Sequence, residues 1–130
     1  MKQLQCFERT TGLDIFLEAN GRRMAAVKSC EAAARREGLP LAPFGESEGR
    51  AAGLGPMQYT LTLTRLAPEA EEIDLFSLSG FSLVIVKPES RILYEGCEWL
   101  SITERLSPDT YAVENAVLLA LSRRRLPKEE

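Results

Sequence analysis

The sequence contains no histidine among its 130 residues. Imidazole is the usual base that activates serine and cysteine nucleophiles, and it is a frequent zinc ligand. Its absence therefore excludes Ser–His and Cys–His catalytic pairs and every histidine-containing metal site. The three cysteines, Cys6, Cys30 and Cys97, are an odd number without close spacing. This pattern predicts reduced thiols in a cytoplasmic protein.

Long apolar runs are also missing. The longest ones, such as residues 116–121, are far too short to span a bilayer, and the N-terminal nine residues have no apolar core of signal-peptide length. We therefore expect neither a membrane segment nor a secretory signal. The formal net charge of −3 lacks the basic surplus that is usual for nucleic-acid-binding proteins, although a local basic face is compatible with an acidic total.

The composition that is present is that of an ordinary globular domain, with 45% hydrophobic and 27% charged residues. A chain of 130 residues is long enough to bury a substantial core in one domain. We expect a flexible N-terminal arm at residues 1–12, a single β-rich domain at residues 13–125 and a disordered tail at residues 126–130.

A β-hairpin is predicted at residues 13–27, where two apolar stretches flank Asn20-Gly21. Asn-Gly suits a two-residue type I′ turn because both positions need positive φ. Counting outward from that turn gives three cross-strand pairs: Leu17 with Met24, Ile15 with Ala26, and Glu18 with Arg23. Two pairs are apolar and one joins opposite charges, so the register is consistent on both faces.

Three further segments have the composition of strands. Residues 59–66 alternate strictly, with Tyr and Leu on one face and Thr on the other. Residues 81–86 and 91–102 are rich in β-branched and aromatic residues, and the turn residues 87–90 lie between them. Such a meander builds the wall of a sheet or barrel.

Two segments are compatible with either helix or strand. Residues 30–37 contain strong helix formers and stop at Gly38, but pairing in a sheet often overrides such propensity. Residues 111–125 follow Pro108 and end in three arginines, and their periodicity slightly favours a helix. Residues 73–78 have the pattern of one or two helical turns. Residues 39–57 contain too much glycine and proline for a regular element, and connections of this length are usually functional or disordered.

Two features suggest chemistry, but a simpler interpretation is better for each. Cys97 lies beside Glu98 and has no histidine to activate it. A cysteine between Gly96 and Trp99 in an apolar strand is more often a small buried packing residue. Residues 49–55 resemble a phosphate-binding loop only in glycine content, because they lack its Gly-Lys-Ser/Thr ending.

The charged clusters have similar explanations. The acidic group Glu69, Glu71, Glu72 and Asp74 lacks the spacing of a calcium loop, and a helix start favoured by the dipole explains it better. Basic groups at 22–23, 35–36 and 123–125 lack interleaved aromatics, which predicts surface or inter-subunit salt bridges. Trp99 is expected to be a core or interface anchor. We therefore predict no enzyme, no catalytic, cofactor-binding or metal-binding residues, and no small-molecule substrate.

The order of these pieces resembles the tail-tube and tube-like structural proteins of tailed phages, prophages and phage-derived contractile particles. The resemblance covers roughly residues 13–125. It is carried by the following pieces in chain order: NGR at 20–22, FGE at 44–46, the glycine loop at 53–55, the alternating strand at 59–66, DLFSL at 74–78, FSLVI at 81–85, YEGCEW at 94–99, and a closing segment with Glu114 and Arg123-Arg124.

This resemblance implies a mainly β fold, a small β-barrel or sandwich with one short flanking helix at about residues 71–78. It also implies that residues 30–37 and 111–125 are strands, against the helical periodicity of the latter. Such proteins assemble as rings, often hexameric, that stack into a tube. The ring needs head-to-tail contacts that close by rotation, and strand edges and long loops supply them.

The expected function is a non-enzymatic structural subunit of a phage tail or phage-derived tail-like particle: a tube, tube-end or adaptor piece. Its expected partners are itself and other tail proteins, with no cofactor, first in the cytoplasm during assembly and then in the virion or particle. The candidate subunit-interface loop contains Phe44, Gly45, Glu46, Arg50 and Leu54. The alternative is a small nucleic-acid-binding β-barrel protein that uses its arginines.

Overall fold

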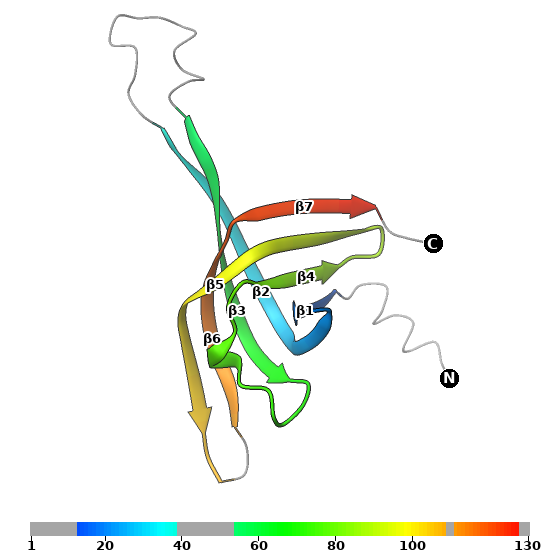
Figure 1. The fold of residues 1–130 in the computed structure, drawn as a ribbon, viewed down its shortest axis with the longest axis vertical. Coiled ribbons are helices and arrows are strands. Elements are labelled where there is room, and N and C mark those ends of the chain that lie inside the picture. Colours follow the sequence, from blue (N-terminus) through cyan, green and yellow to red (C-terminus); the bar gives the residue numbers. More distant parts are fainter. Residues whose placement is uncertain (1–12, 39–53, 109–110, 128–130) are drawn as a thin grey trace, which may run out of the picture.

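The computed structural model of the chain describes residues 13–38, 54–108 and 111–127. These residues form antiparallel strands and one short 3-10 turn, so the fold is mainly β, as predicted (Figure 1). The elements in chain order are β1 (Asp14–Ala19), β2 (Arg22–Gly38), β3 (Leu54–Pro68), η1 (Leu75–Ser77), β4 (Phe81–Val86), β5 (Ser90–Leu106), β6 (Tyr111–Ala120) and β7 (Ser122–Pro127).

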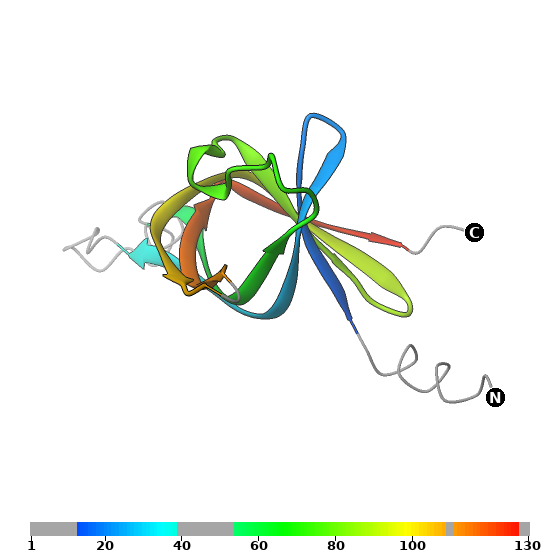
Figure 2. The same ribbon diagram turned by 90° about the horizontal axis from the view of Figure 1, so that it is seen from below.

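The strand pairings close on themselves. The hydrogen-bonded order is β4-β1-β2-β3-β6-β5-β7, and β4 also pairs with β5, which returns the circuit to its start. Seen from below, the strands curve around a common interior (Figure 2). This closed arrangement agrees with the expected small barrel or sandwich.

Two long strands, β2 and β5, each take part in both of the sheets that enclose the core. β2 and β5 are each 17 residues long, and each changes neighbours partway. The beginnings of both strands join β1, β4 and β7 in what we call the first sheet. Their later parts flank β3 and β6 in the second sheet, whose strand order is β2-β3-β6-β5. A strand that switches sheets in this way forms a corner of an orthogonal sandwich.

The core lies between the two sheets. Its fully buried leucines come from both sheets, Leu17 and Leu83 from the first and Leu61, Leu63, Leu66 and Leu118 from the second. The alternation predicted for residues 59–66 places the apolar side chains of β3 in this core. Leu75 of η1 closes one end of the core and is only 3% exposed.

The first hairpin has the predicted turn but a different register. Asn20 and Gly21 have φ of 54° and 74°, as a type I′ turn requires, and Glu18 faces Arg23. The predicted pairs of Leu17 with Met24 and Ile15 with Ala26 are wrong. Leu17 faces Ala25 instead, because a β-bulge between Leu17 and Glu18 gives β2 one extra residue. The bulge keeps the apolar residues of both strands on the core face.

The two segments whose sequences are compatible with either a helix or a strand are strands in the structure. Residues 30–37 lie within β2, where pairing with β3 outweighs the helix propensity of the alanines and arginines. Residues 111–125 are divided between β6 and β7, with Leu121 at the junction. β7 continues to Pro127, beyond the expected end of the domain at residue 125, and the expected N-terminal arm at 1–12 lies outside the described residues.

The flanking helix expected at residues 71–78 is reduced to the single turn η1. Asp74 caps this turn by accepting a hydrogen bond from the backbone N–H of Phe76. The Ser77 hydroxyl donates to the carbonyl of Asp74, and the Trp99 indole donates to that of Leu75. These bonds fix the turn in place, and the backbone of Leu78 that follows is extended, with φ of −71° and ψ of 143°, so the helical turn ends at once. Among the described residues, no helix has the length and apolar character that crossing a membrane requires.

Candidate assembly surfaces

The second sheet has an unpaired edge on each side. Within the described chain, no strand pairs with residues 28–38 of β2 on the side opposite β3. Likewise, no described strand pairs with residues 98–106 of β5 on the side opposite β6. An edge strand presents a row of free N–H and C=O groups, which is a template for another strand. β7 also has one unpaired side, but it is a short strand that carries three arginines.

The outer face of the second sheet is covered by small and hydroxyl-bearing side chains. Thr60, Thr62 and Thr64 point away from the core, as the alternation of β3 predicts. Their partners on β6 include Val117 and Leu119. The same register places Glu31 of β2 beside Thr62 and Glu98 of β5 beside Leu119, so the face combines hydroxyl, apolar and charged side chains.

Exposed leucines cluster where the second sheet meets the first. Leu100, Leu119 and Leu121 are 57%, 40% and 81% exposed. Here Gly96 has φ of +67°, and the Leu121 N–H donates to the carbonyl of Glu95 across a distance of 2.9 Å. Large apolar side chains that gather on an exposed face are typical of surfaces covered by a partner.

The predicted interface loop falls mostly outside the described residues. Phe44, Gly45, Glu46 and Arg50 lie in the undescribed segment, and the expected connection at residues 39–57 is shorter than predicted. Leu54 is the first residue of β3 and pairs with Gly38. The breakers near it are accommodated because the β2–β3 register is irregular between Arg36 and Gly38.

Residues 35–38 and 54–58 form an arm that projects from the sandwich (Figure 1). β3 pairs with β6 only from Tyr59 onward, so the arm consists of two strands alone. Every described side chain of β2 from Glu31 to Gly38 is exposed. The arm thus reaches beyond the core, where it is free to contact another molecule.

Cys97 and Trp99 are packing residues. The Cys97 side chain is fully buried and its thiol donates to the carbonyl of Tyr94. Burial raises the pKa of the Cys97 thiol to about 12, and the nearby carboxylates of Glu98 and Glu95 act in the same direction. A thiol in this state is a poor nucleophile. The Trp99 ring packs on Phe81 with centroids 4.8 Å apart.

Three of the arginines on β2 and β7, Arg22, Arg23 and Arg124, are paired with carboxylates. Arg22 lies 3.0 Å from Glu72, and this contact lowers the pKa of the Glu72 carboxyl. Arg23 contacts Glu69 and Asp14, and Arg124 contacts Glu95. The prediction of surface salt bridges is confirmed for these arginines. The acidic segment is consequently not the start of a helix but a loop tied to the beginning of β2.

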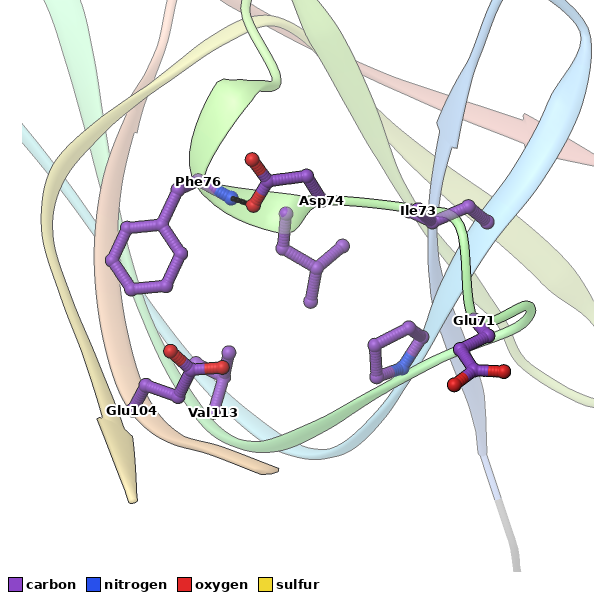
Figure 3. Close-up of a pocket in the computed structure, with 8 residues that line it drawn as sticks. Glu71, Ile73, Asp74, Phe76, Glu104 and Val113 are labelled. Carbon is purple, nitrogen blue, oxygen red and sulfur yellow. Dashed lines mark hydrogen bonds between the residues drawn. The ribbon is translucent and has the colours of Figure 1, made fainter. Parts of the chain in front are cut away.

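One small pocket lies beside η1, with a volume of about 80 Å³ (Figure 3). Glu71, Asp74 and Glu104 line it together with the apolar side chains of Ile73 and Phe76. The pocket is too small for a typical metabolite. In the part of the chain that the structure describes, no three side chains are arranged to hold a metal ion.

Glu98 connects β5 to the loop that precedes β4. Its carboxylate accepts hydrogen bonds from the Ser79 hydroxyl, at 2.9 and 3.0 Å, and from the Gly80 N–H, at 2.9 Å. The same loop is held by the 2.8 Å bond from Trp99 to Leu75. These contacts keep η1 on the core face of the second sheet without adding a strand to its edge. The described residues thus form a β sandwich with two open sheet edges, and its sequence matches no known family model and no curated protein.

Proposed function

We propose that this protein is a non-enzymatic structural subunit of a phage tail or phage-derived tail-like particle, as a tube, tube-end or adaptor piece. The observation that carries this proposal is the pair of unpaired edges on opposite sides of the second sheet. The order of sequence pieces that resembles tail-tube proteins supports it independently.

The β2 edge and the β5 edge of the second sheet are different surfaces, so pairing between them repeats in one direction and favours a ring. If β2 of one copy pairs with β5 of the next, every contact is head-to-tail, and the series closes when the rotation between copies divides a full turn. The charges fit such a contact. The β2 edge, residues 28–38, carries three cations and two carboxylates, whereas the β5 edge, residues 98–106, carries two carboxylates and one arginine, so the two edges have net charges of opposite sign. The exposed leucine Leu100 lies on the same β5 edge and is covered in this arrangement.

Gel filtration with light scattering, followed by negative-stain imaging, tests this function. The expected result is a closed ring or a short tube of this chain. A protein that remains strictly monomeric at high concentration, without rings or tubes, would argue against the proposal.

A pair of adjacent proline substitutions tests the edge itself. Ala33 and Ala34 face Thr60 and Tyr59 in a regular part of the ladder. Of two neighbouring residues in a strand, one N–H points to β3 and the other to the free edge. Ala33→Pro and Ala34→Pro therefore serve as each other's control. The variant with the higher melting temperature is the one in which proline replaces an N–H that points to the free edge and not to β3. We expect that variant to form no rings. Rings of wild-type abundance from that variant would exclude edge pairing through β2.

The same samples test the alternative function, a small nucleic-acid-binding β-barrel protein. Such binding weakens steeply as salt is raised. We expect no shift of an oligonucleotide at low salt, because the net charge of −3 repels phosphates and Arg22, Arg23 and Arg124 are already paired with carboxylates. A salt-sensitive shift would favour the alternative.

A further inference from the structure

An open groove lies at the end of the sandwich opposite η1, between the first sheet and the arm. It has a volume of about 500 Å³. Its walls are apolar: Ile85, Ile92 and Tyr94 come from the first sheet, and Ala34, Met57 and Tyr59 come from β2 and β3. Tyr59 and Tyr94 meet edge to face across it, with centroids 5.9 Å apart. One end of the core is thus closed by Leu75, while the other end is open to a ligand.

Among the described residues that line this groove, the charged side chains are cationic. They are Lys87 and Arg123, and none of the described lining residues is a carboxylate. Arg36 and Arg125 lie on the same faces, because they pair with the groove residues Met57 and Ile92. Within the described chain, none of these four cations makes an ion pair. Arg123 is held in place by Tyr94, whose hydroxyl accepts from its Nε at 3.2 Å.

The opposite end of the molecule has the complementary character. Glu71, Asp74 and Glu104 surround the small pocket beside η1, and none of the ion pairs among the described residues uses them (Figure 3). Phe76 is 46% exposed there and Ile73 is partly exposed. This acidic, apolar end is defined here as residues 71–76 together with Glu104.

The acidic end is held in place and does not reach the groove of its own molecule. Leu75 is buried, its carbonyl accepts from the Trp99 indole, and the Glu69 N–H donates to the carbonyl of Met24 at the start of β2. The far lip of the groove, at Ala34, lies ten residues further along β2, roughly 33 Å in an extended strand. A contact between the ends therefore joins different copies, repeats in one direction and produces a stack.

We propose that the cationic groove binds the acidic, apolar end of a second copy of this chain. Ile73 or Phe76 of the second copy enters the apolar groove, and its carboxylates face Lys87, Arg123 and Arg125. This inference rests on the proposed function, because it supplies the axial contact between rings while the β2 and β5 edges supply the lateral contact.

Charge reversal at both ends tests the inference. One variant reverses the groove with Lys87→Glu and Arg125→Glu, and another reverses the acidic end with Glu71→Lys and Glu104→Lys. All four side chains are at least partly exposed, so circular dichroism and melting temperature are expected to match the wild type. Each variant alone is expected to weaken stacking by about tenfold or more, because attractive pairs become repulsive. Equimolar mixing restores stacking, and so does the combined variant with all four changes.

Sedimentation velocity and negative-stain imaging separate the possible outcomes. Unstacked rings from each variant, with stacks restored on mixing, support the inference. Stacking that is unchanged in both variants overturns it and leaves the proposed function standing. If the wild type forms linear polymers without rings, and the same substitutions abolish and restore those polymers, the ring is overturned and the groove contact is supported. A wild-type chain that does not self-associate overturns both.

Discussion

Replacing Gly96 with alanine tests the bend at which β5 passes from the first sheet to the second. Gly96 has φ of +67°, a conformation that costs an L-residue about 1–2 kcal/mol. A Cβ at this position would lie 2.8 Å from Cδ1, 2.9 Å from Cγ and 3.0 Å from Cβ of Leu121. Crowding of this kind costs about 1–3 kcal/mol. We therefore expect Gly96→Ala to lower the free energy of unfolding by about 2–5 kcal/mol in total.

Gly80 provides a matched control. It has φ of +61°, but a Cβ there would meet nothing within 4 Å. Gly80→Ala is expected to cost only the backbone part, about 1–2 kcal/mol. The difference between the two variants measures the contact with Leu121.

A double-mutant cycle isolates that contact. Leu121 is 81% exposed, so Leu121→Ala alone is expected to change stability by no more than about 0.5 kcal/mol. It removes Cγ and Cδ1 but leaves Cβ, so Gly96→Ala becomes about 1 kcal/mol less harmful in that background. Urea unfolding at low protein concentration measures these values, and about 4 °C of melting temperature corresponds to each kcal/mol. If Gly96→Ala were no worse than Gly80→Ala and showed no coupling to Leu121, the account of the bend would be refuted.

Three further predictions concern Trp99 and the buried thiols. Trp99→Phe removes the 2.8 Å hydrogen bond to the Leu75 carbonyl. We expect it to lower the free energy of unfolding in urea by about 1–2 kcal/mol. An unchanged free energy of unfolding would mean that the indole does not hold η1. Cys97 is expected to resist thiol reagents at pH 8 until the protein unfolds, and rapid labelling of native protein would contradict its burial. Burial raises the pKa of Cys30 to about 11 and that of Cys97 to about 12 from 9.0, so an unfolded chain loses these protons first. Stability is therefore expected to fall as pH rises from 9 towards 12, and Cys97→Ala should reduce that slope.

The features of the fold that are determined by residues adjacent in the sequence could be predicted from the sequence. Asn20-Gly21 specifies its turn through backbone preference, and the alternation at 59–66 specifies which side of β3 is buried. The bulge at Leu17 could not be predicted, because it adjusts the hairpin to the core that the other strands complete. The flanking helix expected at 71–78 is only the single turn η1, and the bond from Trp99 of a distant strand to the Leu75 carbonyl could not be predicted from local residues.

The surfaces proposed for assembly were largely hidden in the sequence. The sequence suggested the loop with Phe44, which lies outside the described residues, whereas the open edges follow from which strands pair. The cationic groove gathers Arg36, Lys87, Arg123 and Arg125 from three separate stretches of the chain. Periodicity within one stretch carries no information on such a meeting. The close approach of the Leu121 side chain to Gly96, a residue of another part of the chain, likewise could not be predicted from either stretch alone.

The closed circuit of strands has a consequence for how the chain folds as it is synthesised. Neighbouring strands such as β1 and β2 can pair as soon as they emerge from the ribosome. The pairings between non-consecutive strands cannot form so early. In the two longest-range ones, β1 waits for β4, which brings Asp14 to Val86, and β3 waits for β6, which brings Tyr59 to Ala120. Such non-local pairings make folding slow, on the order of milliseconds to seconds. Until β6 arrives, one edge of β3 is unpaired, so the last third of the chain protects the first two thirds from premature association.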